Sequence, residues 1–150
     1  MSFSMDTVSP SGVLVCAACG QKNRVKVTAG GVPHCAKCGA PLPWLVDVST
    51  SDFETSVVAS PVPVLADFWA PWCAPCRMTA PVVERMASDL AGRLKVAKVN
   101  TDEQPELGNR FGVRGIPTLI LLQNGREKDR IVGAMPAAQM RSWLESRLER

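Results

Sequence analysis

The sequence predicts an α/β protein in which a central mixed β-sheet is flanked by helices and preceded by a small cysteine-rich domain. Strand and helix patterns alternate from residue 44 onward, and the last two strand patterns are separated by an Asn-Gly pair. Four of the six cysteines fall within the first 43 residues. Alternating patterns favour a sheet covered by helices, and Asn-Gly is a strong signal for a hairpin.

Composition limits the functional classes. The chain has 150 residues, of which 46% are hydrophobic and 21% charged, which is typical of a soluble globular protein. A net charge of +3 with interleaved signs gives no basis for nucleic-acid binding. No apolar run approaches the roughly 20 residues of a membrane helix. The N-terminal MSFSMDTVSPSG lacks a secretory pattern, so we expect a cytoplasmic protein, whose cysteines serve as metal ligands or redox groups.

The composition of the chain changes near residue 44. Residues 1–43 have too little continuous apolar sequence to build a core alone. In the stretch GAPLPW, Pro41 and Pro43 prevent a helix and favour a linker or turn. We therefore predict one domain at 1–43 and a second at 44–150.

The second domain begins with DVSTSDFETSVVAS, which predicts a short strand and then a helix capped by Ser49 or Ser51. The apolar run VPVLADFW predicts a buried strand. A helix should follow from about Cys73 to Leu90, with a kink at Pro81. The alternating RLKVAKVN then predicts another strand.

The remaining elements complete the sheet. DEQPELGNRFGV predicts a short helix, and TLILLQ and REKDRIVG predict two antiparallel strands joined at Asn124-Gly125. MPAAQMRSWLESRLER predicts a closing amphipathic helix, whose apolar residues at helical spacing are Met140, Trp143, Leu144 and Leu148.

The N-terminal domain carries two C-x-x-C pairs, separated by fifteen residues. This spacing is the one expected of a four-thiolate zinc site, with the ligands Cys16, Cys19, Cys35 and Cys38. Each pair forms a tight turn that points two sulfurs at one ion, and Gly20 and Gly39 allow the left-handed residue that such a turn needs. The segment between the pairs can form a small hairpin.

One structural Zn²⁺ per chain would supply the folding free energy that this domain lacks, on the order of 10 kcal/mol. The alternative is that the four cysteines are free thiols or disulfides. His34 adjoins Cys35 but is expected to be a bystander. Because no aromatic residue lies between the pairs, base stacking has no platform, and a stabilising or partner-docking role is favoured.

The third pair, WCAPC, follows a predicted buried strand and opens a predicted helix. Unpaired N–H groups and the helix dipole should stabilise a thiolate at Cys73 and lower its pKa. Cys76 lies one turn further in, less exposed, and Pro75 stiffens the turn. The pair therefore predicts two-step thiol–disulfide exchange, the alternative being a structural pair.

From about Val46 onward the sequence resembles thioredoxins, through ADFWAPWCAPC, KVNTDEQPELGNRFGVRGIPTLILLQNG and Gly133. With the upstream cysteine pairs, the chain resembles the zinc-binding, two-domain thioredoxins of the thioredoxin 2 type. This resemblance implies a thioredoxin fold behind a zinc ribbon. It also implies a monomeric protein-disulfide reductase that acts on disulfide-containing proteins and is recharged by thioredoxin reductase and NADPH. No Gly-rich dinucleotide motif is present, so no flavin or nicotinamide is expected to bind directly.

The resemblance also implies roles for individual residues. Asp67 matches the buried carboxylate beneath the cysteines, and burial should raise its pKa so that it can accept a proton from Cys76. Lys98 matches a lysine that accompanies this acid. Pro117 matches a cis-proline that faces the disulfide. The apolar surface for target proteins would comprise Trp72, Gly115, Ile116, Gly133 and Ala134, whereas Trp69 is expected to pack.

Two residues depart from the usual thioredoxin pattern. Ala74 stands where glycine is usual, and Arg77 stands where lysine is common, so the reduction potential is left open. A disulfide oxidant or isomerase is therefore a second hypothesis. A third is a zinc-dependent binding module or redox-controlled chaperone, because thiolate ligands can themselves be oxidised.

Overall fold

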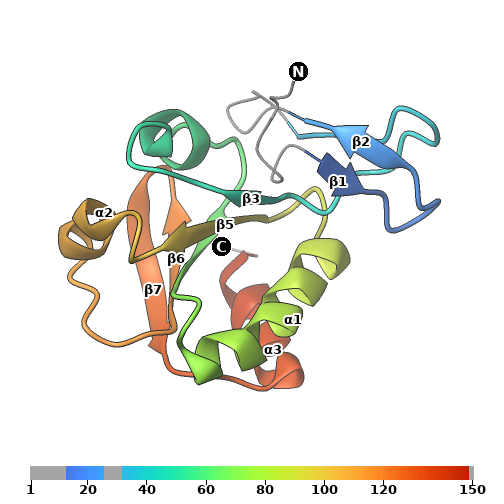
Figure 1. Cartoon of the computed structure of the whole chain (residues 1–150). Coiled ribbons are helices and arrows are strands. Elements are labelled where there is room, and N and C mark those ends of the chain that lie inside the picture. Colours follow the sequence, from blue (N-terminus) through green and yellow to red (C-terminus); the bar gives the residue numbers. More distant parts are fainter. Residues whose placement is uncertain (1–12, 26–31, 149–150) are drawn as a thin grey trace.

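The computed structural model describes residues 13–25 and 32–148, and it confirms the predicted α/β architecture (Figure 1). A five-stranded mixed sheet has the order β3-β5-β4-β6-β7. Strands β3, β5 and β4 are parallel to one another, β6 runs antiparallel to β4, and β7 returns antiparallel to β6 as the second strand of a hairpin. The strand bounds are β3 Leu45–Asp47, β4 Val64–Trp69, β5 Lys95–Asn100, β6 Thr118–Gln123 and β7 Arg126–Val132.

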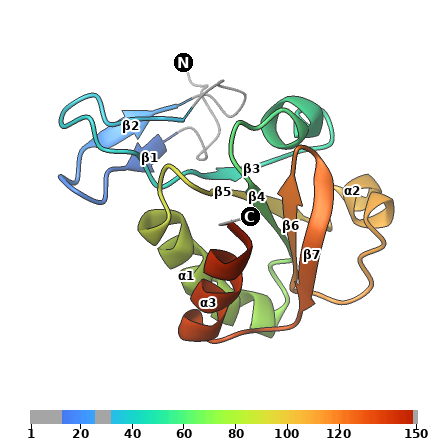
Figure 2. The same cartoon turned by 180° about the vertical axis from the view of Figure 1, so that it is seen from behind.

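Helices cover both faces of this sheet. The helices α1 (Ala74–Asp89) and α3 (Ala137–Leu148) lie together on one face, as Figure 2 shows from behind. The short helix α2 (Pro105–Arg110) and the π-helical turn η2 (Glu54–Val58) lie on the other. Because side chains alternate along a strand, Leu65 of β4 packs with α1 and α3, whereas Phe68 packs with Phe53 and Phe111 on the opposite side.

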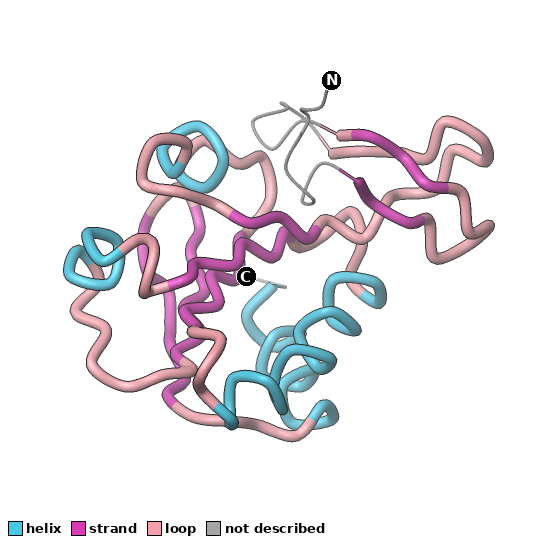
Figure 3. The backbone as a smooth tube through the Cα atoms, in the orientation of Figure 1, coloured by secondary structure: helices cyan, strands magenta, loops and turns pink. Residues whose placement is uncertain are grey.

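The N-terminal region forms a small sheet of its own (Figure 3). Strands β1 (Val13–Val15) and β2 (Lys22–Arg24) pair antiparallel across the first C-x-x-C turn. The hairpin expected between the two cysteine pairs would reverse within residues 26–31, which lie outside the described residues, whereas the CAACG turn itself reverses the chain between β1 and β2. The second turn is closed by a bridge between His34 and Pro41.

The small sheet shares its core with the large one. Leu14 is buried in the same cluster as Trp44 and as Val46 and Ala97 of the large sheet. A backbone hydrogen bond also ties the segment before β3 to the large sheet, since the Val96 N–H of β5 donates to the Trp44 carbonyl oxygen at 2.7 Å. The predicted domain boundary between residues 43 and 44 stays a prediction.

Two details of the first helix patterns differ from expectation. The segment after β3 forms only the five residues of η2, and neither predicted serine caps it. The hydroxyls of Ser49 and Ser51 lie 2.9 Å apart, and the Asp52 carboxylate accepts a hydrogen bond from the Ser49 N–H at 2.7 Å. Helix α1 begins where predicted and is not interrupted at Pro81, whereas the kink expected there stays a prediction.

Among the described helices, none is both long and apolar enough to cross a membrane.

Candidate functional site

Cys73 and Cys76 form a disulfide at the N-terminus of α1, with their Cα atoms 5.2 Å apart. Strand β4 leads into this turn. Cys73 is the N-cap of the helix, with an extended backbone, and its sulfur accepts a hydrogen bond from the Cys76 N–H at 3.2 Å. Pro75 lies in the first turn, where its missing N–H costs no helical hydrogen bond. Cys73 Sγ thus lies beside the backbone N–H groups at the N-terminus of α1 that have no partner within the helix.

The two cysteines are equally covered, each with 4% of its surface exposed. The expectation that Cys73 is the more exposed of the two is therefore wrong for the disulfide form. Both sulfurs pack against Ala70, with Trp69 and Ile116 beside them. Trp72, in contrast, is 68% exposed next to the pair and confirms the expected exposed aromatic at the site.

The loop before β6 faces the disulfide. Its Ile116–Pro117 peptide bond is cis, and the Ile116 carbonyl oxygen lies 3.7 Å from Cys73 Sγ. The N–H of Gly133 donates to the Pro117 carbonyl oxygen at 2.8 Å, so the end of β7 lies beside this loop. Gly115 and Ala134 are exposed at the rim. The residues expected to form an apolar surface thus come from three segments: the turn before α1 (Trp72), the loop before β6 (Gly115 and Ile116) and the chain after β7 (Gly133 and Ala134).

Trp72 is held by a partner that the sequence did not indicate. Its Nε1–H donates to the Asp102 carboxylate, at 3.0 Å from Oδ2. A groove of about 280 Å³ runs between Trp72 and the loop at Ile116, with Arg114 and Asn109 on its polar side. Nothing in the local sequence around Asp102 marks this contact, because it joins segments thirty residues apart.

Asp67 lies in β4 and is 2% exposed, which confirms the expected burial. Its Oδ1 atom accepts no hydrogen bond from the described residues. Desolvation raises the pKa of Asp67 to about 6, and the nearby charge of Lys98 opposes that rise. A buried carboxyl with a pKa near neutrality can exchange a proton under physiological conditions.

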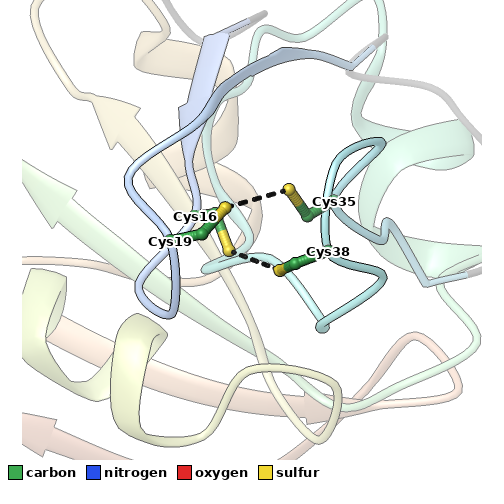
Figure 4. A group of neighbouring side chains, drawn as sticks. All are labelled: Cys16, Cys19, Cys35 and Cys38. Carbon is green, nitrogen blue, oxygen red and sulfur yellow. Dashed lines mark hydrogen bonds between the residues drawn. The ribbon is translucent and has the colours of Figure 1, made fainter.

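The four upstream cysteines converge on one point, as Figure 4 shows. All four sulfurs lie within 4.8 Å of one another. Two pairs, Cys16 with Cys38 and Cys19 with Cys35, are 3.6 Å apart. A tetrahedral zinc with Zn–S bonds of about 2.3 Å separates its sulfurs by about 3.8 Å, so the arrangement fits this ion.

The backbone of each turn supports the sulfurs. Gly20 and Gly39 have φ angles of 80° and 81°, the left-handed conformation expected for them. The N–H of Cys38 is the main cause that lowers the pKa of Cys35 to about 6, which favours the thiolate that a metal binds. His34 does not belong to the cluster of candidate ligands, as expected.

Asn23 connects the two turns and was not identified from the sequence. Its side chain is buried, its Oδ1 accepts from the Ala36 N–H at 2.9 Å, and its Nδ2–H donates to the Gln21 carbonyl oxygen at 3.0 Å. An asparagine in a short strand gives no signal for such a contact, because the partner lies thirteen residues away.

Comparison with known proteins places these sites in context. The family model for thioredoxin matches residues 44–146. Over 144 residues, the chain is 42% identical to the chloroplastic thioredoxin M4 of Arabidopsis thaliana, covering 95% of this chain and 72% of that protein. It is 50% identical to thioredoxin 1 of Nostoc sp. over 101 residues, which cover 67% of this chain and 94% of that protein. It is 42% identical to the thioredoxin of Haemophilus influenzae over 104 residues, covering 69% and 97%.

Proposed function

Because this chain belongs to the thioredoxin family and is a thiol–disulfide oxidoreductase, we propose that it reduces disulfides of target proteins through Cys73 and Cys76. The observation that carries this proposal is the Cys73–Cys76 disulfide at the N-terminus of α1. Its position beside the Ile116 carbonyl leaves a backbone acceptor within reach of an incoming chain.

The reaction begins from the dithiol form. The Cys73 thiolate attacks one sulfur of the target disulfide, forms a mixed disulfide and expels the other target sulfur as a thiolate. Cys76 then loses its proton and attacks Cys73 Sγ, which releases the second target thiolate. Two electrons pass to the target, and the Cys73–Cys76 disulfide remains. Donors at the helix end favour the thiolate of Cys73 over that of Cys76.

Asp67 is the proposed acceptor of the Cys76 proton, directly or through water. Its burial and its raised pKa support this role, because an acid that ionises near pH 6 is a competent base at neutral pH. Trp72, Gly115, Ile116, Gly133 and Ala134 are proposed to contact the target chain. Pro117, through its cis bond, is proposed to present the Ile116 backbone.

The regeneration cycle is also part of the proposal. Thioredoxin reductase, drawing on NADPH, would return the Cys73–Cys76 disulfide to the dithiol. The protein would act as a monomer in the cytoplasm, and it would be of the zinc-binding thioredoxin 2 type. In this arrangement residues 1–43 form the zinc ribbon and 44–150 the redox domain.

One Zn²⁺ is proposed to bind Cys16, Cys19, Cys35 and Cys38. The 3.6 Å sulfur separations, and the backbone donors that lower the pKa of Cys16 and Cys35, support it. With all four ligands from the protein, the ion would have no open position for substrate and would serve to hold the two turns together.

The direct test is reduction of insulin disulfides, measured with dithiothreitol as electron donor and then with a thioredoxin reductase and NADPH. We expect a large acceleration over the donor alone, and none from Cys73→Ser. Absence of acceleration by the wild-type protein would refute the proposed function. Zinc analysis with thiol counting should give one zinc and two freely reactive thiols in reduced protein.

A redox-controlled metal site is a second candidate function, supported by the exposure of Cys19 and Cys38. Thiolates that solvent can reach are open to oxidation even when they bind metal. Treatment with hydrogen peroxide should then release zinc to a chromogenic chelator and increase protection of a partner from aggregation. Retention of zinc under these conditions would exclude this function.

A further inference from the structure

A row of three charged residues crosses the sheet. In the paired registers, Asp47 of β3 lies opposite Lys98 of β5, and Lys98 lies opposite Asp67 of β4. Residues opposite one another on neighbouring parallel strands project from the same face. Here it is the face covered by α1, because the residues two positions earlier on the three strands pack in the α1 cluster: Leu45, Val96 and Leu65.

Exposure increases along this row from the core to the edge of the sheet. Asp67 is buried, Lys98 is half-buried, and Asp47 is exposed on the edge strand β3. The charges along the row therefore alternate, and Lys98 lies between the buried carboxyl of Asp67 and the solvent-exposed carboxylate of Asp47. Lys98 is also fixed from the side, since its Nζ lies 4.8 Å from the centroid of the Trp69 ring.

Two cavities adjoin the row. One has a volume of about 600 Å³ and the other about 380 Å³, and both are lined by Asp47, Trp69 and Lys98. The first also includes Glu84 of α1, and the second includes Glu103 from the loop after β5. Among the described residues that line these cavities with Asp47, the two acids and Lys98 are the charged ones, and the cavities give solvent a way to the row.

The electrostatics of the row agree with its geometry. Desolvation is the main cause that raises the pKa of Asp47, Lys98 opposes that rise, and Glu103 adds to it. Lys98 also opposes the raised pKa of Asp67. The positive charge of Lys98 is thus shared between an exposed carboxylate and a buried one.

We propose that Asp47 is a positioning residue for the redox reaction: by sharing Lys98 with Asp67, it sets the pH at which Asp67 exchanges a proton with Cys76. This inference rests on the proposed function. Without the charge of Asp47, Lys98 is balanced by Asp67 alone, and the Asp67 carboxylate is stabilised. Asp67 then releases its proton at lower pH.

The first test follows the Asp67 carboxyl by ¹³C NMR as a function of pH. In Asp47→Asn we expect its titration midpoint to move down by about half a pH unit, the effect of removing one charge two strands away. Asp47→Glu, which keeps the charge, should restore the wild-type midpoint. Glu84→Gln is the matched control, because it removes an equal charge from the same cavity but not from the row.

The second test measures the pH profile of single-turnover reduction of a disulfide substrate. The rising limb assigned to Asp67 should move to lower pH in Asp47→Asn, in step with the NMR midpoint. In a Lys98→Gln background, Asp47→Asn should move the midpoint by less, because only the direct repulsion between the two carboxylates remains.

The inference is wrong if Asp47→Asn titrates like the wild type, or if Glu84→Gln moves the midpoint by as much. Either result can occur while insulin reduction is intact, in which case the proposed function stands. Failure of the wild-type protein to reduce insulin would instead remove the function and leave the NMR titration interpretable by itself.

Discussion

Asp67 is an acid that the fold keeps away from water, and its burial costs stability when it is charged. Its pKa is about 6 in the folded protein, against an ordinary value of 3.8. Between these pH values the native state holds a proton that the unfolded state has lost. The contribution of this group to stability is therefore complete below pH 3.8 and is lost as the pH rises through 6.

Asp67→Asn should accordingly stabilise the protein at neutral pH. The gain at pH 7.5 is expected to be about 3 kcal/mol at most, from a difference of about two pKa units. Urea unfolding of both proteins at pH 4 and pH 7.5 measures it. The gain should shrink towards zero at pH 4, and a gain that is equal at both pH values would show that burial of the charge is not its cause.

Lys95 is the buried charge that sequence analysis did not identify. It lies in β5 with 1% of its surface exposed, and its Nζ donates to the carbonyl oxygen and the hydroxyl of Ser56 at 2.6 and 2.9 Å. The ammonium also lies 4.3 Å from the centroid of the Trp44 ring. An alternating strand suggests an exposed lysine, but η2 and the chain at Trp44 cover this one.

Desolvation lowers the pKa of Lys95 to about 8 from 10.5, with Asp52 opposing. Between these values the unfolded state holds a proton that the folded state has lost, so stability rises with pH. The contribution of Lys95 to the stability of the folded state is fully present above pH 10.5 and is lost as the pH falls through 8.

We therefore expect the free energy of unfolding of Lys95→Met to fall relative to that of the wild type by about 2–3 kcal/mol from pH 7.5 to pH 10, because only the wild type gains stability over this range. Guanidinium unfolding of the oxidised proteins measures this difference. The exposed Lys22→Met is the control and should show none. A pH-independent difference for Lys95→Met would mean that the lysine is charged throughout.

The hairpin between β6 and β7 is the element that local sequence predicts best. Asn124 and Gly125 have φ angles of 55° and 78°, as an Asn-Gly turn requires. At Gly125 there is a second constraint, because an added Cβ would lie 2.8 Å from Val58 Cγ1. The turn therefore packs against η2, and valine has little freedom to move its branched side chain away.

Gly125→Ala should cost more stability than Gly112→Ala. Both positions have positive φ, which costs an alanine about 1–2 kcal/mol, but a Cβ at Gly112 would meet nothing within 4 Å. We expect Gly125→Ala to lose at least about 1 kcal/mol beyond the control in urea unfolding. Equal losses of stability in the two variants would show that Val58 moves away from the added Cβ without a cost in free energy.

The turns of the small sheet depend on Asn23. Asn23→Ala removes the acceptor for the Ala36 N–H and should weaken zinc binding by about 10- to 100-fold, as losses of supporting contacts do elsewhere. Competition with a chromogenic chelator measures the affinity. Gln21→Ala is the control, because the Gln21 side chain makes only an exposed contact to Lys22, and an equal loss in both variants would contradict this account.

Local pattern was sufficient for β4 and β6, because each is a continuous apolar run, and for β7, because the Asn124-Gly125 turn marks its start. It failed for η2, where a helix of ordinary length was expected and five residues form. Phe53 precedes η2 at the N-cap position without a side-chain hydrogen bond, and its ring is buried in the core. Packing of that ring, which no local pattern contains, decides the conformation there.

The same limit applies to the candidate site. Spacing alone predicted that Cys73 and Cys76 could bond and that four other cysteines could hold an ion. The contacts of Asp102 and Asn23, and the closeness of the Ile116 carbonyl to Cys73, could not be predicted this way. Each joins segments that are distant along the chain, and only the packed fold brings them together.

The two sheets share one buried core, through Leu14 and Trp44 with Val46. We therefore expect the chain to unfold in a single transition when zinc is bound. Removal of zinc by a chelator should lower the midpoint of this single transition, so that the large sheet unfolds at a lower temperature together with the small one. Differential scanning calorimetry measures both, and two transitions, of which only one responds to the chelator, would show that the parts are independent.

Strand β7 closes one side of the large sheet, and five successive residues in it are charged: Arg126, Glu127, Lys128, Asp129 and Arg130. An unpaired outer strand is normally a template on which another polypeptide can extend the sheet. Any such polypeptide would have to strip water from this dense run of charge. If the protein reduces disulfides of target proteins, as proposed, this run of charge guards it against pairing with those targets along its own outer strand.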